Sequence, residues 1–188
     1  PYMKSLPPSI GNLKNLKRLD LAEMEGLSKL PDEIGDMTNL GCLKISATYA
    51  LKMLPPSIKK LKNLKRLEGY TNGLERFPEE IGNLDCLERL NLLGCRLKSF
   101  PRSIGNLKNL KMLALPTDDN TITEFPDEFR NLTNLEKLTF TPADQGDLYS
   151  DFVYPSVVIP DSIAKLPKLV VLEITWCVFL PEELQNLT

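Results

Sequence analysis

A stretch of sixteen residues returns along this chain at a nearly constant interval. Leu6–Leu21 recurs almost word for word as Phe100–Leu115, and weaker copies fill the rest of the chain. The proline that follows a large apolar residue falls at Pro7, Pro31, Pro55, Pro78, Pro101, Pro126, Pro160 and Pro181. Most steps between these prolines are 23 to 25 residues, and the two exceptions are 34 and 21. Such a period is the signature of a solenoid, so we predict one solenoid domain over residues 1–188.

Each repeat has two halves with different apolar spacing. In the first half, Ile10, Leu13 and Leu16 are three residues apart, which suits a single helical or 3-10 turn. In the second half, Leu19 and Leu21 alternate with polar residues, as a short half-buried strand requires. Proline is expected at the first helical position, where its missing N–H costs nothing. The sequence therefore predicts an α/β fold with a parallel sheet on one side and short helical turns on the other.

The fourth repeat matches the consensus sequence of a known family. Its residues Leu87, Leu90, Leu92, Cys95 and Leu97 match the pattern L-x-x-L-x-L-x-x-N/C-x-L. The chain thus resembles the leucine-rich repeat family. The resemblance implies a curved horseshoe with the sheet on its concave face, and it implies that the Cys95 side chain turns inward to satisfy backbone groups. About seven repeats and a partial C-terminal one fit the chain, which we expect to be a fragment of a longer protein.

The subtype can be narrowed further. Leu27–Gly35 resembles the L-x-x-L-P-x-x-I-G phrase of intracellular repeats, which plant nucleotide-binding immune receptors and Ras-group leucine-rich repeat proteins carry. The extracellular plant form usually has a Gly-x-Ile-Pro phrase, and no glycine stands two or three residues before a repeat proline here. The resemblance implies a cytoplasmic location.

Composition narrows the range of functions. The net charge is −2 and the chain has no histidine, so no overall positive field points to nucleic acid and the usual general base at neutral pH is missing. No apolar run approaches the roughly 18 residues of a membrane span. The four cysteines form no CxxC pair, so we expect reduced thiols rather than a metal site. We therefore expect no enzyme activity, no cofactor, no bound nucleic acid, no membrane segment and no small-molecule ligand.

Aligning the repeats predicts two rows of outward side chains on the sheet. The residue before the middle leucine is Arg18, Cys42, Arg66, Arg89, Met112, Lys137 and Val171. The residue after it is Asp20, Lys44, Glu68, Asn91, Ala114, Thr139 and Glu173. A broken basic stripe thus lies beside a partly acidic one, and we expect Arg18 to pair with Asp20 and Arg66 with Glu68. An anion pocket in the basic stripe is the less favoured alternative.

The chain departs from the repeat pattern in two ways, by one glycine at a core position and by insertions after two strands. Gly69 stands where an inward leucine is expected, which indicates either a packing gap partly filled by neighbouring side chains or a local shift that turns Tyr70 inward. Extra residues at 142–156, and a shorter insertion around Asp118, follow predicted strands and should emerge at one edge of the sheet. Insertions on one face of a solenoid are often at the binding face.

The leading hypothesis is a protein–protein interaction module, the recognition or scaffolding arm of a larger signalling protein. The alternatives are the substrate-recognition arm of an enzyme, such as a ubiquitin ligase or receptor kinase, and a structural subunit of a large assembly. We predict a partner site on the concave face toward its C-terminal half, formed by Arg66, Tyr70, Arg89, Leu93, Met112, Lys137 and Trp176. We also predict that the insertion contributes Tyr149, Phe152 and Tyr154, unless these aromatics fold back onto the sheet.

Overall fold

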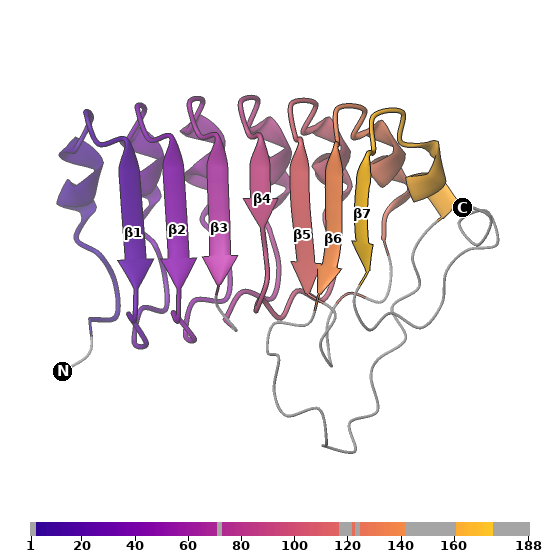
Figure 1. Cartoon of the computed structure of the whole chain (residues 1–188). Helices are drawn as coiled ribbons and strands as arrows, with labels where there is room; N and C mark the ends of the chain where they lie inside the picture. The colour runs from indigo at the N-terminus through magenta and orange to yellow at the C-terminus, as the bar shows by residue number, and fades with distance from the viewer. Residues whose placement is uncertain (1–2, 71–72, 117–121, 123–124, 142–160, 175–188) are drawn as a thin grey trace, which may run out of the picture.

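Seven parallel strands form one open sheet in chain order, with a 3-10 helix before each strand (Figure 1). The computed structural model describes residues 3–70, 73–116, 122, 125–141 and 161–174. The strands are β1 (Arg18–Ala22), β2 (Cys42–Ser46), β3 (Arg66–Tyr70), β4 (Arg89–Asn91), β5 (Met112–Pro116), β6 (Lys137–Thr141) and β7 (Val171–Ile174). The 3-10 helices are η1 (Pro8–Asn12), η2 (Asp32–Asp36), η3 (Pro56–Lys60), η4 (Glu79–Asn83), η5 (Arg102–Asn106), η6 (Asp127–Asn131) and η7 (Asp161–Lys165). The predicted solenoid of strands and helical turns is confirmed.

In η1 to η6 the repeat proline is the N-cap of the 3-10 helix, one residue before the first helical position where it was predicted. Pro31 is the N-cap of η2, with an extended backbone at φ −68° and ψ 153°, and the helix starts at Asp32. Its carbonyl accepts a hydrogen bond from the Ile34 N–H at 3.0 Å. Proline suits this position because its ring fixes φ near −65° and the carbonyl, not the N–H, makes the first bond of the turn.

The core lies between the sheet and the 3-10 helices and is built from the inward leucines of every repeat. Ile34, Met37 and Leu40 are fully buried, as the three-residue spacing predicts. Their counterparts in the first repeat are less covered: Leu13 is 47% exposed, and Ile10 is only partly buried. The first described repeat therefore presents a partly exposed apolar end face.

Neighbouring 3-10 helices approach so closely that glycine is required in the Ile-Gly pair. A Cβ atom at Gly35 would lie 2.4 Å from the Ser57 carbonyl oxygen, and a Cβ at Gly82 would lie 2.4 Å from that of Ser103. Real Cβ atoms do not come that close to backbone oxygens. The glycines of this phrase therefore set the spacing of the stack on its helical side.

Asparagine side chains tie successive repeats together where each helical turn leads into a strand. Asn39 donates its side-chain N–H to the Lys14 carbonyl at 2.8 Å, and Asn63 does the same to Thr38 at 2.9 Å. The pattern continues with Asn109 to Asp85 and Asn134 to Lys108, at 2.7 and 2.6 Å. These bonds satisfy carbonyls that the strands leave unpaired. They form a ladder that runs along the edge of the stack.

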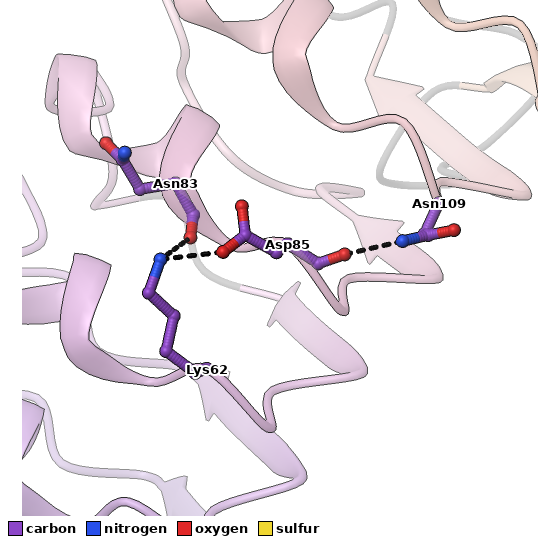
Figure 2. Close-up of polar contacts among 4 residues, drawn as sticks. All are labelled: Lys62, Asn83, Asp85 and Asn109. Atoms are coloured by element: carbon purple, nitrogen blue, oxygen red, sulfur yellow. Dashed lines mark hydrogen bonds and ion pairs between the residues drawn. The ribbon is translucent and has the colours of Figure 1, made fainter.

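The ladder is interrupted at the fourth repeat, where Cys86 replaces the asparagine. Figure 2 shows the contacts of Lys62 at this repeat: its Nζ lies 2.8 Å from the Asp85 carboxylate and donates to the Asn83 carbonyl at 2.8 Å. Asn109 then resumes the ladder on the far side of Asp85. Both partners of the ion pair are more than half exposed, so this link is worth at most about 1 kcal/mol.

Cys86→Asn is expected to stabilise the protein by about 1 kcal/mol, because it restores one side-chain to backbone hydrogen bond, to the Lys62 carbonyl. Urea unfolding should show a higher midpoint with an unchanged slope. Asn109→Cys is the matched control and should lower stability by a similar amount. An unchanged midpoint for Cys86→Asn would show that the ladder contributes nothing at this repeat.

Candidate protein-binding face

The open face is defined here as the side of the sheet turned away from the 3-10 helices (Figure 1). The backbone register brings together both predicted rows. The first row is Arg18, Cys42, Arg66, Arg89, Met112, Lys137 and Val171. The second row is Asp20, Lys44, Glu68, Asn91, Ala114, Thr139 and Glu173. Both rows are confirmed strand by strand.

The arginines of the first row differ in how they are neutralised. Arg18 forms the predicted ion pair with Asp20 at 3.3 Å. The predicted pair between Arg66 and Glu68 does not form, and within the described part of the chain neither Arg66 nor Arg89 has a carboxylate within 4.0 Å. Both side chains are exposed and sit on neighbouring strands in direct register. Two adjacent positive charges thus lie near the centre of the sheet.

A shallow groove follows the first row across β1 to β4. Its volume is about 440 Å³, and its lining is Lys17, Arg18, Gly41, Cys42, Lys65, Arg66, Glu88 and Arg89. Cys42 is the small residue in a row of long ones and is 2% exposed, so it forms the floor. Glu88 is the one acidic group of the lining, and it lies 3.8 Å from both Lys65 and Lys111. The groove is therefore strongly basic.

Tyr70 stands at the end of β3 with its ring on the open face. It is 43% exposed, and its hydroxyl accepts a hydrogen bond from the Asn91 side chain at 2.7 Å. The Lys44 ammonium lies 5.9 Å from the ring centre, which is a cation–π distance. Partial burial, and then the charge of Glu68, raise the pKa of the Tyr70 hydroxyl above its usual value, so the ring stays neutral. Two neighbours thus hold an exposed aromatic in place.

The Gly69 position is filled from an adjacent repeat. Cys95 Sγ lies 3.0 Å from where a Gly69 Cβ would stand, and the thiol donates to the Gly69 carbonyl at 3.0 Å. Gly69 is buried, and the Tyr70 side chain points outward. The space expected at Gly69 is thus filled by a neighbouring side chain, and the alternative of an inward Tyr70 was wrong. The inward turn of Cys95 toward a backbone group is confirmed.

Leu93 does not join the row of Tyr70. Strand β4 has three residues and ends at Asn91, whose side chain accepts a hydrogen bond from the Leu93 N–H at 3.1 Å. The chain then turns through Gly94 at φ 78°, a conformation that suits glycine. Leu93 is half-buried in this turn. The local cap formed by Asn91 therefore removes Leu93 from the sheet.

The C-terminal half of the open face is less accessible than predicted. Met112 is half-buried, and Ala114 and Thr139 are 6% and 8% exposed. Lys137 is paired with Glu173, which also accepts a hydrogen bond from the Thr139 hydroxyl at 3.1 Å. Lys137, and then Thr139, lower the pKa of the Glu173 carboxyl. The charge of Lys137 is thus already neutralised, and among the described residues of the predicted site Arg66, Tyr70 and Arg89 are the exposed ones.

Other predicted residues lie outside the described part of the chain. These are Trp176, Tyr149, Phe152 and Tyr154. Among the residues that the structure describes, no three His, Cys, Asp or Glu side chains could hold a metal ion together. In the same described ranges, no helix is long and apolar enough to cross a membrane. Cys42, Cys86 and Cys95 are all reduced.

Comparison with known proteins agrees with the geometry. A family model described as a leucine-rich repeat region matches residues 70–154. The solved structure of a plant peptide hormone receptor, RGFR1 in complex with RGF2, is 28% identical with a TM-score of 0.64, and covers 97% of this chain. The chain has the fold of a leucine-rich repeat solenoid. A search of curated proteins finds no match.

Two further structures resemble this chain. A TDR receptor is 28% identical over 90% of the chain, with a TM-score of 0.62. The leucine-rich repeat domain of the type III effector XopL is 22% identical over 93% of the chain, with a TM-score of 0.58, and shares the fold. The chain spans 32% of the RGFR1 chain and 28% of the TDR receptor chain, so it corresponds to about a third of either.

Proposed function

We propose that the open face around Arg66, Tyr70 and Arg89 is the protein-binding surface of an interaction module. The observation that carries this proposal is the exposure, on the neighbouring strands β3 and β4, of two arginines without carboxylate partners and of a hydrogen-bonded tyrosine at the other end of β3. Tyrosine and arginine are the residue types most enriched at binding hot spots. A preformed surface also loses little conformational entropy when a partner binds.

The similar structures favour a protein or peptide as the ligand. RGFR1 is described as a peptide hormone receptor in complex with RGF2. The fold is shared at 28% identity, so binding of a polypeptide on the sheet is the role we propose for this chain. The Leu-Pro-x-x-Ile-Gly phrase further supports a recognition or scaffolding arm within a larger, cytoplasmic signalling or immune protein.

A second candidate is the recognition arm of a receptor or enzyme. The two structures that share 28% identity are both receptors, and each is about three times as long as this chain. In this case the open face would bind the ligand or substrate, and other parts of a longer protein would supply the signal or the catalysis. The sequence that flanks this segment in its gene distinguishes the two candidates.

Site-specific photo-crosslinking in the native cell tests which side of the protein contacts a partner. A benzoylphenylalanine at position 70 replaces Tyr70 with a residue of similar shape, and the same residue at position 106, at the end of η5, is the control. We expect one discrete adduct from position 70 and none from position 106. Adding Arg89→Glu should abolish the adduct. An adduct from position 106 alone would contradict the proposal and favour a spacer role.

A further inference from the structure

The basic groove carries charge that its own surroundings do not balance. Arg66 and Arg89 occupy directly paired positions on β3 and β4. Like charges at such positions destabilise a sheet. Asp20 forms ion pairs with Arg18 at 3.3 Å and with Lys44 at 3.9 Å. Glu88 forms ion pairs with two lysines, both at 3.8 Å. A bound anion would relieve the repulsion between Arg66 and Arg89 without disturbing these pairs.

The shape of the groove suits carboxylates that arrive on an extended chain. Its floor is Cys42, which is 2% exposed, and Arg18 and Arg66 stand on either side because they flank Cys42 in the register. From β1 to β4 the row crosses three strand spacings, which is about 14 Å. Four extended residues span a similar length. Arginine binds carboxylates through two parallel hydrogen bonds, which also fix their orientation.

We infer that this groove binds an acidic segment of a protein partner, with carboxylates at Arg66 and Arg89. The inference rests on the proposed function and names the chemistry of the partner. The acidic residues of the second row disfavour nucleic acid as the ligand. Asp20 and Glu68 lie two residues after Arg18 and Arg66, on the same strands. An extended phosphate backbone would meet these carboxylates, whereas a narrow acidic segment would lie along the first row alone.

Fluorescence anisotropy with a defined probe tests the inference. The probe is a labelled, C-terminally amidated Glu-Glu-Tyr-Glu-Glu peptide, compared with its lysine counterpart, with inorganic phosphate and with a single-stranded 20-mer of DNA. The variant is Arg66→Gln with Arg89→Gln. The matched control is Arg76→Gln with Arg96→Gln, which removes two exposed arginines that lie outside the groove lining and changes the net charge equally.

We expect the acidic peptide to bind the wild-type protein and the lysine peptide not to bind. The Arg66→Gln/Arg89→Gln variant should bind the acidic peptide at least tenfold more weakly, and the Arg76→Gln/Arg96→Gln control should bind like wild type. The first variant should remain folded, with a melting temperature equal to or above wild type, because it removes a like-charge contact.

Three results would overturn the inference. They are the absence of peptide binding at millimolar concentration, an equal loss in both double variants, and tighter binding of DNA or of phosphate alone with the same dependence on Arg66 and Arg89. If the peptide fails to bind but crosslinking from position 70 still depends on Arg89, the proposed function stands and only the acidic chemistry of the partner is wrong.

Discussion

Gly82→Ala is expected to lower the free energy of unfolding by about 3 kcal/mol, although alanine is ordinarily the better residue in a helical turn. The added Cβ would lie 2.4 Å from the Ser103 carbonyl oxygen and 2.7 Å from the Ser103 Cβ. Both atoms belong to the next repeat, in η5, so the clash can be relieved only by moving the two repeats apart. Urea unfolding followed by circular dichroism measures the change.

The control for this change lies in the chain itself. Lys59 occupies the corresponding position in η3, where a side chain is already present. Lys59→Ala should therefore change stability by less than about 0.5 kcal/mol, as expected for an exposed site. If Gly82→Ala were as mild as Lys59→Ala, the close approach of η4 and η5 would not limit the packing of the stack.

Gly69→Leu is expected to destabilise the protein by about 2 to 3 kcal/mol, the range for an overpacked core. A leucine at this position meets Cys95 Sγ, which lies 3.0 Å from the first added carbon. It also displaces the thiol from its hydrogen bond to the Gly69 carbonyl. Thermal unfolding should show the loss as a lower melting temperature.

A double-mutant cycle identifies the cause of that loss. Cys95→Ala alone should cost about 1 kcal/mol, since it removes a small buried group and one hydrogen bond. If the two side chains compete for one space, adding Cys95→Ala to Gly69→Leu should recover part of the stability rather than add to the loss. Additive losses would mean that something other than Cys95 resists the leucine.

The consensus pattern of the repeats was sufficient to predict the strands, the helical turns and both rows of the open face. Parallel stacking at a constant period places equivalent residues of successive repeats side by side. The sequence alone therefore predicts that Arg18, Cys42, Arg66 and Arg89 are neighbours in the sheet. The basic groove could have been recognised in that list, because a cysteine between arginines leaves a hollow. Its significance was missed since the charges were expected to neutralise one another.

Contacts between repeats were harder to predict, because they depend on distances that a one-dimensional pattern does not contain. Gly69 looked like a gap, yet Cys95 of the next repeat fills it. Leu93 looked like a strand residue, yet Asn91 caps the chain two residues earlier. The exposed part of the site also shifted toward β3 and β4, since Lys137 is neutralised by Glu173 and Met112 is half-buried.

The central claim is that the open face, and not the helical side, binds the partner. The most direct test is the affinity of the crosslinked partner, once it is isolated, for two matched double variants. We expect Arg89→Glu with Tyr70→Ala to weaken binding at least tenfold, about 1.4 kcal/mol, while the melting temperature stays near wild type. Arg130→Glu with Thr133→Ala, on η6 and the loop that follows it, should bind like wild type. Unchanged affinity for the first variant, with loss in the second, would contradict the claim and place the site on the helical side.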